Sequence, residues 1–124
     1  MSDCLTRLKR EGEFMSLFAQ YLTERSNDRI LELEQGFATY RMLPDQKAIY
    51  LIDIFVHPDL RHSNLASSMA DKVADIGKKE GYTKMVGSII PSTKNSTAAL
   101  KIALAYGMKL SSSAVDFIAL EKDL

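Results

Sequence analysis

The sequence predicts one α/β domain spanning residues 1–124, with a mixed, mostly antiparallel sheet flanked by helices. The chain of 124 residues is long enough for one compact core and too short for two domains. Its first half alternates polar and apolar residues before a continuous apolar run, as strands do. Its second half alternates helical periodicity with short apolar runs, which favours a parallel crossover between neighbouring strands.

The first expected element is an amphipathic helix near residues 14–26. Its apolar residues recur at helical spacing: Phe14, Met15, Phe18, Tyr21 and Leu22. The period then changes to two, which predicts antiparallel strands near 29–34, 37–43 and 47–56. The third of these, "AIYLIDIFV", is apolar almost throughout, so it should be covered on both faces and lie centrally in the sheet.

A second helix is predicted from Leu65, Met69, Val73 and Ile76, which share one helical face. It should end at "KKEGY", where the glycine suits a C-cap. "TKMVGSIIP" then predicts a short strand, "NSTAALKIALAYGM" a helix ending at Gly107, and "AVDFIALEK" a last strand. The serines 111–113 are expected in a loop. A helix that joins two parallel strands begins at the edge where both strands end, and α/β proteins bind ligands at that edge.

Composition narrows the classes of function. Sixteen Lys and Arg balance sixteen Asp and Glu along the chain, which argues against nucleic acid or a membrane surface as a partner. The single cysteine, Cys4, excludes an internal disulfide framework and a Cys-rich zinc site, and no metal site is expected. The N-terminus has no apolar core of the signal-peptide type, so a soluble, cytoplasmic protein is expected.

The turn "VHPDLRHSNLA" between the central strand and the next helix is the candidate binding site. The first N–H groups of a helix lack intrahelical partners and carry partial positive charge, which suits a pyrophosphate. Arg61 and His62 lie just before the helix, and Ser63, Asn64 and Ala66 are small enough for close backbone approach. Spacing alone favours a plainer interpretation, in which "SN" caps the helix and Arg61 is a solvated charge.

The segment "IDIFVHPDLRHSNLA" resembles the acetyl-CoA segment of the GNAT superfamily of N-acetyltransferases, whose pattern is V-x-P-x-x-R followed by R/Q-x-x-G-x-G/A. Val56, Pro58, Arg61 and Ala66 match this pattern. A later segment, "KNSTAALKIALAYGMKL", resembles the family's N-x-x-A…G-F pattern through Asn95, Ala98 and Gly107-Met108. The order of elements also matches from about residue 14 onward.

The resemblance implies a fold, a cofactor and a site. The central strand and its parallel neighbour would splay apart to form a cleft for acetyl-CoA, and an amine of a small molecule or protein would accept the acetyl group. The pantetheine arm would pair with backbone near Phe55 and Val56, and Asn95 would lie beside it. The pyrophosphate would be held by Arg61 and by the start of the helix, namely His62, Ser63, Asn64, Leu65 and Ala66.

The chain departs from the family pattern at three positions. Asn64 replaces the first loop glycine, Ala103 a tyrosine that protonates the leaving thiolate, and Ile52 a glutamate that acts as base. Asp53 is the candidate catalytic base, although strand alternation should turn it to the face opposite Ile52. An Asp in an apolar strand is either a functional carboxylate with a raised pKa or a satisfied buried acid, and the sequence favours neither.

Other bases and other functions stay open. Glu32, Glu34 or a bound water could replace Asp53, although such a glutamate pair more often forms the solvent face of a strand. Besides an N-acetyltransferase, the chain could be a catalytically degenerate binding or structural module with the GNAT fold. It could also be an unrelated α/β interaction domain. The acceptor is unknown from the sequence, and homodimerisation is left open.

Overall fold

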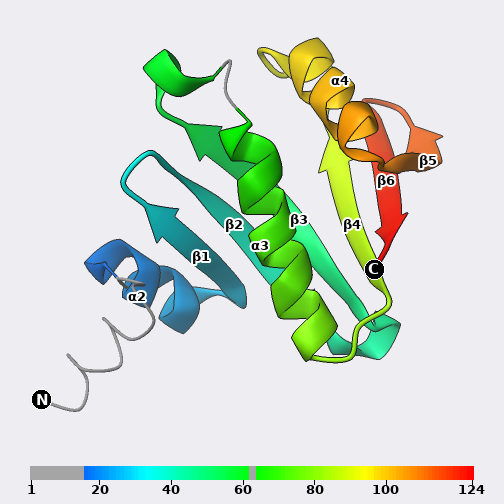
Figure 1. The fold of residues 1–124 in the computed structure, drawn as a ribbon. Coiled ribbons are helices and arrows are strands. Elements are labelled where there is room, and N and C mark those ends of the chain that lie inside the picture. The colour runs from blue at the N-terminus through cyan, green and yellow to red at the C-terminus, as the bar shows by residue number, and fades with distance from the viewer. Residues whose placement is uncertain (1–15, 62–63) are drawn as a thin grey trace, which may run out of the picture.

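The computed structural model describes residues 16–61 and 64–124, which form one mixed sheet with helices packed on it (Figure 1). The strand order is β1-β2-β3-β4-β6-β5, and every neighbouring pair is antiparallel except β3 and β4. The strands are β1 (Asp28–Leu33), β2 (Gly36–Leu43), β3 (Ala48–Val56), β4 (Lys84–Ile89), β5 (Lys109–Ala114) and β6 (Phe117–Asp123). The helices are α2 (Leu17–Arg25), α3 (Leu65–Lys79) and α4 (Ser96–Tyr106), with the short 3₁₀ turns η2 (Pro44–Gln46) and η3 (Pro58–Leu60).

The three antiparallel strands and the central place of β3 confirm the prediction from the first half of the chain. The helix predicted from Leu65 to Ile76 is also confirmed, and its facing residues Met69 and Val73 are fully buried against the sheet. Across all described residues, the helices are too short and too polar to cross a membrane.

The end of the chain differs from the prediction. Instead of one last strand after a serine loop, residues 109–123 form a hairpin of two antiparallel strands, with β5 at the sheet edge. The serines 111–113 lie in β5, and every residue of that strand is exposed. Because neither face of β5 is buried, its sequence does not alternate between polar and apolar residues. It is a strand because its backbone pairs with β6. Asp116 turns the hairpin with φ 53°, a left-handed geometry that Asp tolerates better than most residues.

The N-terminal helix also differs from the prediction. Phe14 and Met15 lie outside the described residues, and α2 begins after Ser16, whose Oγ accepts a hydrogen bond from the Ala19 N–H at 3.0 Å. The predicted apolar face was wrong for Phe18 and Tyr21, which are 55% and 54% exposed, whereas Leu22 is half-buried. Ala19 is the buried residue of the helix. The helix packs mainly on the edge strand β1, which is too narrow to cover a full helical face.

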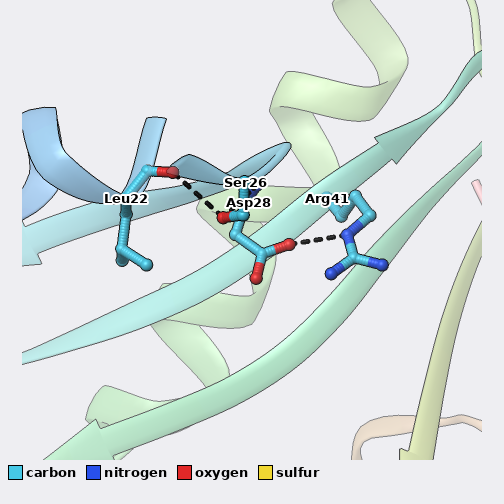
Figure 2. A network of polar contacts seen from close by, with 4 residues as sticks. All are labelled: Leu22, Ser26, Asp28 and Arg41. Carbon is cyan, nitrogen blue, oxygen red and sulfur yellow. Dashed lines mark hydrogen bonds and ion pairs between the residues drawn. The ribbon is translucent and has the colours of Figure 1, made fainter. Parts of the chain in front are cut away.

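A chain of polar contacts fixes the corner between α2 and the sheet (Figure 2). The Ser26 Oγ donates to the Leu22 carbonyl at 2.9 Å and accepts from the Asp28 N–H at 3.2 Å. The Arg41 Nε then donates to Asp28 Oδ1 at 2.6 Å, across the β1–β2 register. This hydrogen bond, with the charge of Asp28, raises the pKa of Arg41. The end of the helix is therefore tied to two strands.

The helix α3 covers β2, β3 and β4 and makes the centre of the core. It lies close to β3 because Gly77 faces Ile49. A Cβ atom at Gly77 would be 2.9 Å from Ile49 Cγ2 and 3.0 Å from Leu124 Cδ1. The absence of a side chain at Gly77 therefore sets the distance between the helix and the strand that carries the candidate site.

Candidate active site

The two central parallel strands separate toward their carboxyl ends. The register joins β3 to β4 only from Ala48 and Lys84 to Leu51 and Gly87. Beyond it, β3 continues to Val56 and β4 to Ile89 without partners in each other, and the ribbons diverge there (Figure 1). The expected splay of the central pair is confirmed.

A β-bulge lies where the splay begins. Thr39 pairs with Asp53 and Tyr40 with Leu51, so Ile52 is an extra residue on β3 without a partner in β2. An extra residue bends its strand and increases the local twist. The bulge therefore turns the second half of β3 away from the line of β4.

The backbone that faces the gap can be assigned from hydrogen-bond alternation. The His57 N–H donates to the Gln35 carbonyl at 2.7 Å, which continues the β2–β3 ladder one residue past the strand. In an antiparallel pair, alternate residues bond to the partner. Phe55 therefore turns its N–H and C=O toward β2, and Ile54 and Val56 turn theirs toward the gap. The register with β4 has ended before both residues.

Phe55 contributes its ring to the face of the sheet opposite α3. The ring stacks on Phe37, its register partner in β2, with centroids 5.4 Å apart and an angle of 18° between the planes. Val56 has the reverse orientation, because its side chain is buried in the core with α3. The end of β3 thus presents an aromatic surface on one face and a packed side chain on the other.

Arg61 folds over the end of β3. Its Nε donates to the Val56 carbonyl at 3.1 Å, and its guanidinium carbon lies 5.3 Å from the Phe55 ring centroid. Both contacts hold a permanent positive charge at the mouth of the gap. His62 and Ser63, which the sequence assigned to the pyrophosphate site, lie outside the described residues.

The starts of α3 and α4 lie at the same edge of the sheet, because each helix follows one of the splayed strands. Asn64 precedes α3 with φ −84°, exposed and without a side-chain cap bond, so it needs no glycine-like freedom. Leu65 and Ala66 form the first turn and are half-buried. Asn95 precedes α4 with φ 65°, in the left-handed region, and is exposed.

A carboxylate clamp holds the loop before Asn95. Asp116 accepts one hydrogen bond from the Ser92 N–H at 2.8 Å and another from the Ser92 Oγ at 2.6 Å. The loop after β4 is therefore tied to the β5–β6 turn. Sequence reasoning missed this contact because it predicted no hairpin at residues 109–123. The sequence signal that could have indicated this hairpin is Asp116, because Asp is common in tight turns.

Tyr106 is hydrogen-bonded to α3 and does not take the place of the tyrosine that the family pattern has at Ala103. Its hydroxyl donates to Asp71 Oδ1 at 2.6 Å, which joins α4 to α3, and Lys122 lies 4.9 Å from its ring centroid. Burial raises the pKa of Tyr106, and the hydrogen bond and charge of Asp71, with the charge of Asp75, raise it further. A phenol held in this way is a poor proton donor to a departing sulfur.

Asp53 lies on the face opposite α3, in register with Thr39. It is exposed, and in the described part of the chain it has neither a hydrogen-bond nor an ion-pair partner. Partial burial raises the pKa of Asp53 above the ordinary 3.8. The side chain is thus an exposed carboxylate two residues before Phe55, without a polar partner among residues 16–61 and 64–124, and it is not a buried acid satisfied by hydrogen bonds.

A surface depression of about 860 Å³, open to solvent over much of its extent, lies on the same face and includes the aromatic pair in its lining. Phe55 and His57 line it from the end of β3, and Glu32, Glu34 and Phe37 line it from the β1–β2 hairpin. The prediction that both glutamates form a solvent face was wrong for Glu32, which is half-buried and accepts hydrogen bonds from Ser16. Glu34 is exposed, as expected.

These features agree with comparisons to known proteins. A family model described as "Acetyltransferase (GNAT) family" matches residues 8–105. Among curated proteins, none matches the sequence significantly.

Solved structures with low sequence identity share the fold. The PaiA N-acetyltransferase from Thermoplasma acidophilum, in complex with coenzyme A, has a TM-score of 0.70 at 13% identity, over 98% of this chain and 77% of its own. A GNAT family acetyltransferase from Elizabethkingia anophelis with acetyl-CoA bound has 0.66 at 17%, over 87% and 82%. A GNAT family acetyltransferase from Listeria monocytogenes has 0.65 at 18%, over 99% and 83%. With its splayed central strands and its family match over residues 8–105, the chain belongs to the GNAT family of acetyltransferases.

Proposed function

We propose that the chain is an N-acetyltransferase that moves an acetyl group from acetyl-CoA to an amine. The observation that carries this proposal is the loss of pairing between β3 and β4 after Leu51 and Gly87. The gap leaves strand backbone without a neighbour, and such backbone can pair with an extended ligand as with an extra strand.

The residues around the gap fit the cofactor. Ile54 and the Val56 N–H offer backbone groups to a pantetheine arm, whereas the Val56 carbonyl already accepts a hydrogen bond from Arg61 Nε. Arg61 and the first turn of α3 offer positive charge to a pyrophosphate, and Asn95 lies across the gap at the start of α4. When bound, acetyl-CoA supplies a thioester whose S–C bond breaks as the new N–C bond to the amine forms.

Asp53 is the proposed base. An acceptor amine must lose one proton to become a nucleophile, and a carboxylate can take it directly or through one water. The raised pKa of Asp53 brings its basicity closer to that of an amine than an ordinary Asp would. The proton then leaves to solvent or to the departing thiol, whose low pKa makes a dedicated acid less necessary.

A binding module without turnover is the second candidate. It is favoured by Ile52 and Ala103 at the family's catalytic positions and by Tyr106 held to Asp71. Isothermal titration with acetyl-CoA, followed by thiol release with a panel of amines, separates the two functions. Heat of binding with thiol release supports the enzyme, heat without release supports the module, and neither signal contradicts both.

Replacing Arg61 by alanine should weaken acetyl-CoA binding about tenfold, because a charge-assisted contact to the pyrophosphate would be lost. Isothermal titration of both proteins measures the change. The exposed Arg29 of β1 serves as the matched control, and Arg29→Ala should bind as the parent does. Equal affinity for the Arg61 variant and the parent would remove Arg61 from the site.

Replacing Asp53 by asparagine should lower kcat by about a hundredfold or more if Asp53 is the base. The pKa of Asp53 is raised, so in the parent kcat should rise with pH as this carboxyl loses its proton, and the variant should lack this limb. Steady-state rates across acidic to neutral pH measure both effects. Asp45→Asn, at the other end of β3, is the control, and a parental pH profile in Asp53→Asn would assign the base elsewhere.

A further inference from the structure

The closed end of the gap between β3 and β4 carries an inference about the acyl donor. The last paired residues of the two strands are Leu51 and Gly87, and Ser88 is the first residue of β4 beyond this pair. The Tyr50 hydroxyl and the Ser88 Oγ lie 2.6 Å apart, in a hydrogen bond for which either oxygen can be the donor. The two strands are therefore tied by side chains at the point where their backbones stop pairing.

This tie lies on the face of the sheet opposite α3. Ile49 packs against Gly77 of the helix, so the next residue, Tyr50, points to the other face. Val86 pairs with Tyr50 in the register, and Ser88, two residues later, lies on the same face as Val86. Both hydroxyl-bearing side chains are half-buried, so they cover the closed end of the gap on this face.

Met108 covers the same point from the side of α3. Gly87 has no side chain, and a Cβ atom placed on it would be 3.3 Å from Met108 Cε and 3.7 Å from the Leu51 carbonyl oxygen. Met108 is 6% exposed and belongs to the hydrophobic core. The closed end of the gap is therefore filled from both faces, by the hydroxyl pair on one and by a thioether side chain on the other.

The orientation of the donor follows from the place of its charged end. In the proposed function the pyrophosphate lies with Arg61 at the open end of the gap, and the arm runs past Val56 and Ile54 toward the closed end. The acyl group is at the far end of that arm, so it approaches Tyr50 and Ser88. Beyond these two residues the strands are paired and leave no room.

Resting on the proposed function, we infer that Tyr50, Ser88 and Met108 form a floor that limits the donor to a short acyl group. An acetyl group ends above this floor. Each further methylene group has to enter space that the three side chains already occupy, which costs about tenfold or more in affinity in a close-packed site. The acyl group is thus selected by residues that play no part in binding the pyrophosphate.

Isothermal titration with acetyl-CoA and with hexanoyl-CoA tests the inference without requiring turnover. The parent should bind acetyl-CoA at least about tenfold more tightly than hexanoyl-CoA. Tyr50→Leu shortens the side chain and removes the tie, so it should remove most of this preference by strengthening hexanoyl-CoA binding about tenfold. Ser88→Ala frees the same ring without shortening it and should act in the same direction, which keeps the test available if Tyr50→Leu does not fold.

Tyr82→Leu is the matched control, because Tyr82 precedes β4 at the end of the strand away from the gap and packs against the core. It should keep the parental ratio of the two affinities. A merely structural tie would weaken both donors equally, so the ratio is the deciding measurement. Equal affinity of the parent for both donors, an unchanged ratio in Tyr50→Leu and Ser88→Ala, or the same change in Tyr82→Leu would overturn the inference alone. Binding of neither donor would contradict the proposed function and the inference together.

Discussion

Replacing Val56 by proline should leave the protein folded and reduce acetyl transfer about a hundredfold or more. The Val56 N–H faces the gap and has no partner in β4, so its loss breaks no bond of the sheet. In the proposed function this N–H would donate to the bound acetyl-CoA, and removal of one such donor typically costs two to three orders of magnitude in rate. Thiol release under steady-state conditions measures the loss, and circular dichroism confirms the fold.

Val56→Ala is the matched control, because it shortens the same buried side chain and keeps the N–H. It should retain most of the activity and lose only the stability that belongs to two methyl groups, about 1–3 kcal/mol. Equal activity of the proline and alanine variants would show that this amide takes no part in binding or turnover. Phe55→Pro should unfold the protein instead, since the Phe55 N–H belongs to the ladder with β2.

The central position of β3 and the buried face of α3 could be predicted from the sequence. The nearly continuous apolar run of β3, broken by Asp53, predicted a central strand, and the spacing of Met69 and Val73 predicted the helix face that covers it. Both patterns arise because a residue's polarity reports whether its own face is buried. The expectation that β3 is covered on both faces was wrong, because Phe55 on the face opposite α3 is 45% exposed. The splay of β3 from β4 came instead from resemblance to a family. In the structure this splay begins at a β-bulge at Ile52. The alternation of polar and apolar residues in the sequence does not indicate a bulge at that position.

Features that depend on contacts with residues far away in the sequence could not be predicted from local patterns of polarity. The strand β5 is exposed on both faces and exists through its pairing with β6, so its serines carry no strand signal. The apolar residues of α2 predicted a buried face, but the helix meets only the edge of the sheet. Glu32 was expected on the solvent face, but it is half-buried and accepts two hydrogen bonds from Ser16, a residue far from it in the sequence.

Replacing Ile49 by alanine should lower the free energy of unfolding by about 2–5 kcal/mol, a large part of the stability of a domain of this size. Ile49 is fully buried near the start of β3, where Gly77 lets α3 pack directly against its side chain. Loss of its side chain leaves a cavity that the helix cannot close easily, because β2, β3 and β4 all hold it in place. Urea unfolding followed by circular dichroism measures the change.

Ile102→Ala is the matched control, because this isoleucine lies on α4 and is 53% exposed. It should change the free energy of unfolding by less than about 0.5–1 kcal/mol, since little apolar area is lost from the interior. Destabilisation of both variants to the same extent would mean that α4 is covered as completely as the centre of the sheet. A small effect of Ile49→Ala with a large effect of Ile102→Ala would place the core on the other side of the gap. Because β3 carries both the core contact with α3 and the backbone at the gap, the Ile49 variant should also bind acetyl-CoA more weakly than the Ile102 variant.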